Sequence, residues 1–210
     1  GGFPMHILVT GFEPFDGSPV NPSMLAAEAL ARTPPPGLAV TTAILPVDRL
    51  GGPARLLEAL QTVNPRAVVC LGEAGGRAAI SIERVAVNLM DYRIPDNRGE
   101  TVTDQPIDPA GPAAYFSTLP VRAMQEAILA AGIPAELSLT AGAYLCNQVM
   151  YTLLHHLAQT GQTIPAGFIH LPSLPQQAVL RGKPMPTLGL ETILAGLRAA
   201  LAVLARQAVL

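Results

Sequence analysis

Charged residues are scarce in this sequence, at 13% of 210 residues, which is about half the usual share. Lysine and arginine number 13 against 15 acidic residues, so the net charge of −2 excludes the basic surface typical of a nucleic-acid-binding protein. Half of the residues are hydrophobic, but no run reaches the roughly 18 residues of a membrane-spanning helix. Even residues 188–210 contain Glu191, Arg198 and Arg206, so we predict neither a nucleic-acid partner nor a membrane partner.

Only two cysteines are present, Cys70 and Cys146, which excludes a disulfide-rich scaffold. Neither has the spacing of a zinc ligand, so we predict no metal and expect a reducing, cytoplasmic compartment. Residues 5–10 are apolar but too short for a signal peptide, and no basic segment precedes them. The length fits one domain over residues 5–210, and we interpret residues 1–4 as an expression-tag remnant.

The few charges are unevenly distributed. Residues 73–108 hold 11 of the 28 charged residues, whereas residues 137–180 hold none, although they include Cys146 and three of the four histidines. One interpretation is a solvated loop followed by buried core. The other is a catalytic site, in which any carboxylate that serves Cys146 or a histidine comes from another part of the fold.

Strand-like and helix-like segments alternate along the chain. Apolar runs predict strands, and helices are predicted where a cap, such as Asn21 before Pro22, opens an apolar periodicity. This alternation predicts an α/β fold, a single-domain three-layer α/β/α sandwich around a mainly parallel twisted sheet. The predicted strands are residues 6–10, 39–45, 66–71, 80–87, 135–139 and 167–171; the predicted helices are 22–32, 53–63, a region opened by Pro112 and completed by 122–131, 143–156, and 188–207.

Cys146 follows a predicted strand-to-helix turn at residues 140–143. A cysteine in the first turn of a helix lies near the positive end of the helix dipole, which favours the thiolate form. The free N–H groups there can also hold an oxyanion. The alternative is a buried, unreactive cysteine, which is the interpretation that we apply to Cys70.

His170 ends a predicted strand, and we expect it to lie over the same carboxyl edge of the sheet from which the Cys146 helix starts. A thiol needs such a base because free cysteine is mostly protonated near neutral pH. The alternative is a core histidine bonded to the backbone. We interpret His6, His155 and His156 as structural residues.

Glu83 is the most suggestive partner for the histidine. It interrupts the apolar alternation of a predicted strand, and a carboxylate inside a core strand usually has a partner. The alternative is a salt bridge with Arg84 or another neighbour.

Several motifs occur together, in an order that resembles the pyroglutamyl peptidase type I family, also called pyrrolidone-carboxylate peptidases. The resemblance extends over the whole chain from Met5. The motifs are residues 11–15 (GFEPF) and 21–23 (NPS), 75–77 (GGR) and 83–88 (ERVAVN), 93–97 (RIPDN), 140–142 (TAG) with 146–147 (CN), and 168–172 (FIHLP).

The resemblance implies a cysteine exopeptidase, a thiol protease that hydrolyses the bond after an N-terminal pyroglutamyl residue of peptides through a thioester. It implies that Cys146 is the nucleophile, His170 the base and Glu83 the group that orients the histidine. The reaction that the resemblance implies requires no cofactor. Relatives often form tetramers, and the apolar surplus of this sequence favours a homo-oligomer.

The resemblance also implies an apolar pocket for the neutral lactam ring, which has one N–H donor and one carbonyl acceptor. Phe12 and Phe15 are well placed to pack on this ring, although without the motif we would interpret both as core residues. Asn21 matches an asparagine that supports the phenylalanine loop. The remaining positions that the resemblance assigns to the substrate are Arg93, Ile94, Tyr144 and Leu145.

Glu73 departs from the family pattern, which usually has a glutamine there that helps to recognise the lactam. An ionised carboxylate accepts a hydrogen bond from the ring N–H but cannot donate one to the ring carbonyl. Two alternatives therefore stay open: a lactam-binding protein, or a variant with altered specificity. Ser173 and Gln176 also differ from the family pattern, in the loop after His170.

A nucleotide-binding α/β protein is a weaker alternative, suggested by the glycine-rich turn after Leu71. The turn does not match GxGxxG, and it leads into a strand.

Overall fold

A six-stranded sheet organises the computed structural model, which describes residues 3–207. The strand order is β2-β1-β3-β8-β4-β7. The first four strands are parallel to one another, whereas β4 and β7 are parallel to each other and run in the opposite direction. The strands are β1 (Met5–Phe12), β2 (Leu38–Leu45), β3 (Ala67–Glu73), β4 (Ile80–Glu83), β7 (Ala135–Ser138) and β8 (Ala166–Leu171).

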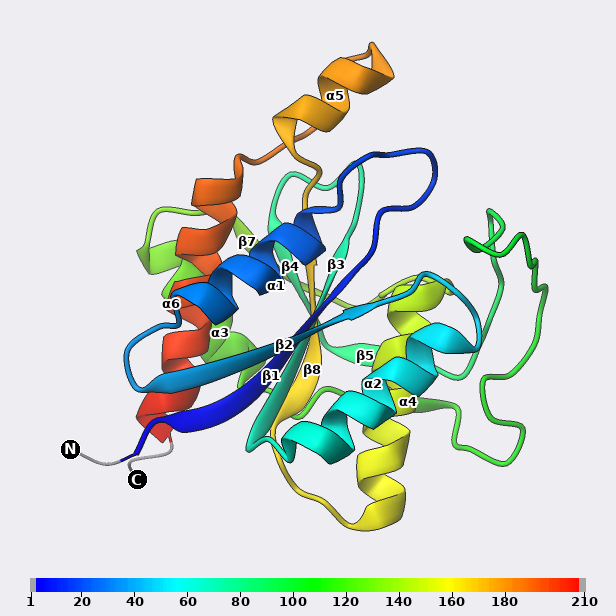
Figure 1. The fold of residues 1–210 in the computed structure, drawn as a ribbon, viewed down its shortest axis with the longest axis horizontal. Coiled ribbons are helices and arrows are strands. Elements are labelled where there is room, and N and C mark those ends of the chain that lie inside the picture. The colour runs from blue at the N-terminus through cyan, green and yellow to red at the C-terminus, as the bar shows by residue number, and fades with distance from the viewer. Residues whose placement is uncertain (1–2, 208–210) are drawn as a thin grey trace.

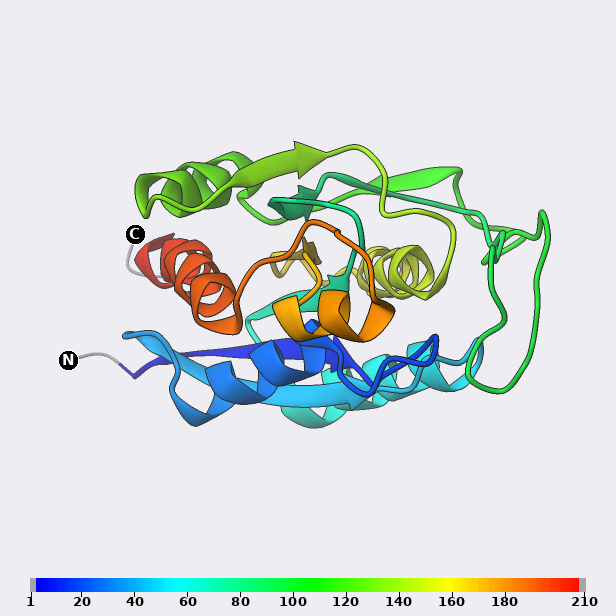
Figure 2. The same ribbon diagram turned by 90° about the horizontal axis from the view of Figure 1, so that it is seen from above.

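Helices cover both faces of this sheet, which confirms the predicted three-layer sandwich (Figures 1 and 2). One face carries α1 (Pro22–Arg32), α3 (Val121–Ala130) and α6 (Leu190–Gln207). The other face carries α2 (Gly51–Val63) and α4 (Leu145–Thr160). Within residues 3–207, no helix is long and apolar enough to cross a membrane.

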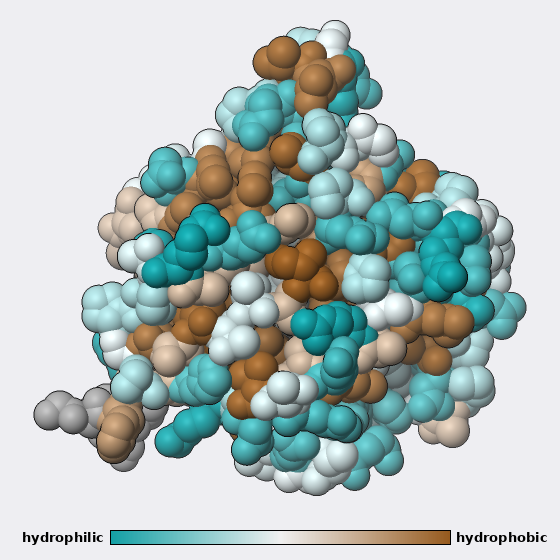
Figure 3. All heavy atoms as spheres, viewed as in Figure 1, coloured by the Kyte–Doolittle hydropathy of each residue, from teal (hydrophilic) through white to brown (hydrophobic). Residues whose placement is uncertain are grey.

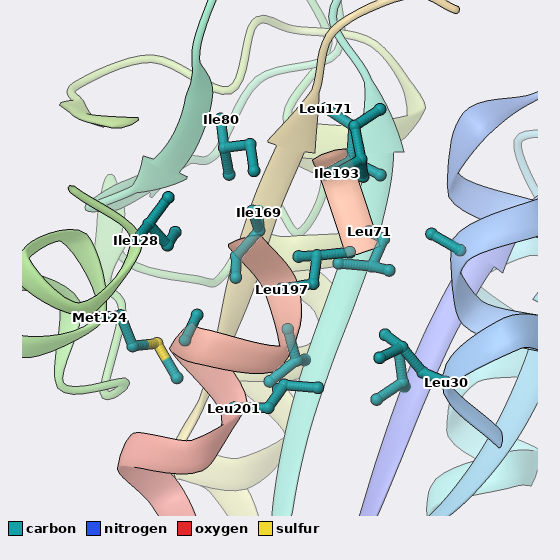
Figure 4. Close-up of a cluster of buried hydrophobic side chains, with 14 of the residues drawn as sticks. Leu30, Leu71, Ile80, Met124, Ile128, Ile169, Leu171, Ile193, Leu197 and Leu201 are labelled. Atoms are coloured by element: carbon teal, nitrogen blue, oxygen red, sulfur yellow. The ribbon is translucent and has the colours of Figure 1, made fainter. Parts of the chain in front are cut away.

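The two central strands, β3 and β8, are buried on both faces, which explains their uninterrupted apolar sequence. Side chains alternate between two cores. Leu71, Ile169 and Leu171 pack against α1, α3 and α6, as Figure 4 shows. Cys70 and Phe168 lie in the second core, against α2 and α4. The sheet face that carries Phe168 is therefore the face on which α4 lies.

Two predicted elements take a different form in the structure. The strand predicted over residues 80–87 divides after Glu83, and β5 (Val85–Val87) leaves the main sheet to pair with β6 (Ala114–Phe116) in a separate two-stranded sheet. The helix predicted from Pro112 is wrong up to residue 120, because that segment forms β6 and a turn. Backbone pairing decides this, since Asn88 N–H donates to the carbonyl of Ala113 at 2.8 Å.

A seven-residue helix that the sequence does not predict, α5 (Pro175–Arg181), follows β8 and projects from the molecule (Figure 1). Pro175 occupies its first turn, and Gly182 ends it with a φ of +62°. Helix α4 begins two residues later than predicted and continues to Thr160. Of the predicted tag remnant, residues 1 and 2 lie outside the described residues, as do residues 208–210 of the predicted domain.

Candidate active site

Cys146 is the second residue of α4, as the sequence predicts, but the chain reaches it by a different route. Strand β7 runs opposite to β8, so the helix does not simply follow the carboxyl edge that His170 ends. Residues 139–144 instead connect β7 to α4. The sulfur of Cys146 lies against Gly72 of β3. A Cβ atom at Gly72 would lie 2.7 Å from this sulfur and 2.6 Å from Phe168, so only glycine allows this approach.

His170 lies beside Gly72 in the register of β3 and β8. Residues two apart on a strand share a face, so the His170 ring lies on the same side as Phe168, with ring centroids 4.8 Å apart. His170 is 4% exposed, and it lines a cleft of about 280 Å³ together with Cys146. The predicted nucleophile and base therefore face one cleft.

Glu83 is the partner of this histidine. It lies opposite Phe168 in the antiparallel pairing of β4 and β8, which puts it on the same face and diagonal to His170. The Glu83 Oε1 and His170 Nδ1 atoms are 2.7 Å apart, and Glu83 is fully buried. Because a carboxylate only accepts, Nδ1 is the donor, and Nε2 remains free to act as a base.

Arg77 is a site residue to which the sequence analysis assigns no role. Its Nη1 donates to Glu83 Oε1 at 2.7 Å, and its Nη2 donates to the carbonyl of Thr140 at 2.9 Å. Arg77 therefore connects the acid to the loop that precedes Cys146. The alternative interpretation of Glu83, a salt bridge with Arg84 or another neighbour, is met by Arg77. The available signal in the sequence was that Arg77 belongs to the GGR motif and to the charge-rich residues 73–108, whereas residues 137–180 have no charged residue of their own.

Burial and neighbouring groups together shift the pKa values of His170, Glu83 and Cys146. It lowers the pKa of His170, although Glu83 acts in the opposite direction, so the histidine is held as the neutral base. Burial alone would raise the pKa of Glu83, but the hydrogen bonds from His170 and Arg77 act against it, and the net effect lowers that pKa. Burial also raises the pKa of the Cys146 thiol, with Glu83 adding to the rise. Burial therefore opposes the thiolate form that the sequence predicts at the helix terminus.

Phe15, Arg93 and Tyr144 line the same cleft as Cys146. The Phe15 and Tyr144 rings are 6.2 Å apart and form an aromatic edge to the cleft. The Tyr144 hydroxyl donates to the carbonyl of Pro95 at 3.0 Å, and its ring meets Tyr92 edge-on, so this edge is fixed from two sides.

Asn21 supports the loop that carries Phe15. Its side chain caps α1 by accepting from Ser23, and its Nδ2 donates to the carbonyl of Glu13 at 3.1 Å. Phe12 and Leu145 are buried, at 2% and 1% exposure, in the core beneath the cleft and do not line it. Ile94 is half-buried and is also not among the lining residues.

Glu73 ends β3 and lines the cleft. Gln177 Nε2 donates to its Oε1 at 2.7 Å, and Ser173 Oγ donates to its Oε2 at 3.4 Å. Burial raises the pKa of this carboxyl group, while the hydrogen bond from Gln177 and the charge of Arg181 limit the rise. Glu73 is thus held by residues of the loop and helix that follow His170.

Comparison with known proteins agrees with this geometry. The model of the family described as pyroglutamyl peptidase matches residues 5–207. The pyrrolidone-carboxylate peptidase of Gloeobacter violaceus is 52% identical over 95% of this chain and 97% of its own length, and that of Streptomyces coelicolor is 48% identical over 96% and 92%. The chain belongs to the pyroglutamyl peptidase family.

Solved structures of family members share the whole fold. A mutant pyrrolidone carboxyl peptidase from Pyrococcus furiosus superposes with a TM-score of 0.92 at 41% identity, covering 98% of this chain and 100% of that one. The pyroglutamyl peptidase I of Bacillus amyloliquefaciens gives 0.91 at 38% identity, covering 96% and 97%. Membership makes the protein a cysteine-type hydrolase, which confirms the predicted class of enzyme.

The other thiol and the other histidines of this pyroglutamyl peptidase family member lie elsewhere. Cys70 is fully buried in β3, where burial raises its pKa to about 12. His6 bonds Thr41 at 2.7 Å, and His155 bridges Asp108 and Tyr115. Within residues 3–207, no cluster of three or more histidine, cysteine or acidic residues is arranged to hold a metal ion.

Proposed function

We propose that the protein removes N-terminal pyroglutamate from peptides by hydrolysing the bond that follows it, with Cys146, His170 and Glu83 as the catalytic triad. The observation that carries this proposal is the shared cleft of Cys146 and His170, in which the histidine is held through Nδ1 by Glu83 at 2.7 Å. The same three residues carry the resemblance to cysteine peptidases of this family.

The reaction begins as the thiol proton moves from Cys146 to Nε2 of His170 while the sulfur attacks the carbonyl carbon after the lactam ring. The raised pKa of the thiol and the neutral state of the histidine suit such a coupled transfer. As the C–N bond breaks, His170 gives its proton to the leaving amine, and a thioester remains on Cys146. Water, deprotonated by His170, then hydrolyses the thioester and releases pyroglutamate.

The first turn of α4 serves the developing oxyanion. The first N–H groups of a helix have no partners inside the helix, and those near Cys146 lie closest to the attacked carbonyl. Phe15 and Tyr144 hold the lactam ring, with Phe12, Ile94 and Leu145 behind them and Asn21 fixing the loop. Arg93 and Glu73 complete the polar contacts of the substrate.

Release of a chromophoric amine from a pyroglutamyl amide tests this function. We expect turnover that is abolished by alkylation and by Cys146→Ser, while the matched Cys70→Ala variant remains active and sensitive to alkylation. Absence of turnover by a folded, reduced sample would leave the lactam-binding alternative, which Glu73 favours, as the better account.

We extend the proposal to a reducing, cytoplasmic location and to a homotetramer. A reducing compartment keeps the catalytic thiol free, and both cysteines are unpaired in the structure. Several hydrophobic side chains gather at the projecting end formed by α5, where Val179 is 79% exposed and Leu180 is 63% exposed (Figure 3). Burial of such a patch between subunits is a common reason for association.

A further inference from the structure

A second cleft, of about 510 Å³, continues from the catalytic cleft toward α5. The two clefts share Phe15, Glu73, Gly75 and Arg93, so they form one continuous groove. Its size lies within the range of ordinary ligand sites. Because pyroglutamate is the first residue of a substrate, everything beyond the cleaved bond belongs to the leaving peptide, which needs a groove continuous with the cleft that Cys146 lines.

The wall of this second cleft is rich in positive charge. Arg93, Arg181 and Lys183 all line it, and Lys183 is the only lysine in the sequence. Within residues 3–207, no carboxylate lies within ion-pairing distance of Arg93 or Lys183, and Arg181 makes only a long contact of 3.9 Å with Asp16. For a protein with so few charges, three cations around one cleft are a marked concentration.

The carboxylates in the same cleft do not cancel this charge. Asp16 faces Arg181 only at the limit of an ion pair. Gln177 Nε2 donates to both oxygens of Glu73, so this carboxylate is already engaged within the protein. Three cations and two carboxylates line the cleft, and among the described residues Arg93 and Lys183 have no ion-pair partner there. The cleft therefore attracts an anion.

The positions of these cations are fixed by the chain. Arg181 ends α5, and Lys183 follows the helix-ending Gly182 and precedes Pro184. The segment is then tied back to the fold where Leu188 N–H donates to the carbonyl of Ser173 at 3.0 Å. Gly75 and Gly76 line the cleft without side chains, which leaves room there for a peptide backbone.

We propose that this cleft is the leaving-peptide subsite and that Arg181 and Lys183 select leaving peptides that carry a carboxylate. The carboxylate is either an acidic side chain or the C-terminal carboxylate of a short peptide. This inference rests on the proposed function. Because both cations are exposed to solvent, the preference is modest and salt-dependent.

Three matched substrates test the proposal. They are the neutral peptide pyroglutamyl-alanyl-glutamine amide, the same peptide with glutamate in place of glutamine, and the same peptide with a free C-terminal carboxylate. At low ionic strength we expect kcat/KM to be about threefold to fivefold higher for at least one charged peptide than for the neutral peptide. The peptide with the larger preference identifies the source of the carboxylate.

The double variant Arg181→Gln/Lys183→Gln is expected to bring this ratio close to one. The control Arg66→Gln removes one exposed positive charge before β3 and is expected to retain the ratio. An enzyme that cleaves all three peptides equally, or a double variant that keeps the preference, overturns the subsite. Failure to cleave even the neutral peptide and a simple pyroglutamyl amide contradicts the proposed function instead.

Discussion

At the scale of single residues, one oxygen atom organises the candidate site. Glu83 Oε1 accepts from both His170 and Arg77 at 2.7 Å, whereas Oε2 is buried without a partner among residues 3–207. Charge-assisted bonds of this kind are short and directional, so Arg77 fixes the oxygen that orients the histidine. The positive charge of Arg77 also lowers the pKa of His170.

We predict that Arg77→Gln lowers kcat by about tenfold to a hundredfold through misplacement of His170. Loss of the positive charge raises the pKa of His170, so the histidine becomes protonated, and activity is lost, at a higher pH than in the natural protein. The measurement is kcat/KM against pH, with Arg77→Lys as a partial rescue. An acid limb that does not move shows that Arg77 is merely structural.

Glu73 gives a second prediction with a defined sign. Only the protonated carboxyl group donates to the lactam carbonyl, and its pKa is raised by burial. The kcat/KM of the natural protein is therefore expected to fall, relative to Glu73→Gln, as the pH rises through that pKa. Superimposable pH profiles of the two proteins would remove Glu73 from substrate recognition.

At the scale of elements, Asn21 links the start of α1 to the aromatic edge of the cleft. The side chain caps the helix with its oxygen and holds the carbonyl of Glu13 with its nitrogen. These two roles belong to different atoms and can therefore be separated by substitution.

We predict that Asn21→Ala destabilises the protein by about 1 kcal/mol through loss of the cap. Asn21→Ser keeps the cap but is too short to hold Glu13, so it is expected to retain most of the stability and to raise KM. Thermal unfolding and kinetics of both variants provide the check. Equal KM values for the natural protein and Asn21→Ser contradict the supporting role of this asparagine.

The sequence predicts the elements whose signals are local. The cap at Asn21 and the apolar strands 66–71 and 167–171 indicate their structures directly, and the structure contains all three. The short strands β5 and β6 depend on pairing across 27 to 31 residues of chain, which no local pattern shows. The reversed direction of β4 and β7 has the same cause, and it changes the route by which Cys146 reaches His170.

The candidate site divides in the same way. The residue types proposed for catalysis are visible in the sequence, and Glu83 is expected because a carboxylate in a core strand needs a partner. Arg77 is missed because its bonds to Glu83 and Thr140 join segments that meet only in three dimensions. The burial that opposes a thiolate at Cys146 cannot be predicted from the sequence, because it depends on segments far apart in the chain, such as Gly72 against the Cys146 sulfur.

At the scale of the whole molecule, the few charged residues and the many apolar residues occupy different parts of the fold. The uncharged segment forms the buried strand and helix that carry His170 and Cys146. Part of the charged segment supplies Arg77 and Arg93 to the same cleft, and Glu83 to the buried side of His170. The apolar surplus fills two cores and leaves the exposed side chains of α5.

We predict that the natural protein is a tetramer and that Val179→Glu/Leu180→Glu dissociates it, because the introduced charges cannot be buried in an apolar interface. Size-exclusion chromatography with light scattering is the measurement. Leu129→Glu, at an exposed position of α3, is the matched control and is expected to leave the tetramer intact. A natural protein that is monomeric, or a tetramer that survives both substitutions, contradicts this prediction.

The most direct test of the central claim is a rapid-quench measurement on a pyroglutamyl amide, combined with mass spectrometry of the quenched protein. The triad in the shared cleft predicts a transient increase in mass equal to one pyroglutamyl group, located on the proteolytic fragment that contains Cys146 and absent in Cys146→Ser. Turnover without any covalent species under conditions that trap thioesters, or a label on Cys70 instead, would contradict the assignment of Cys146 as the nucleophile.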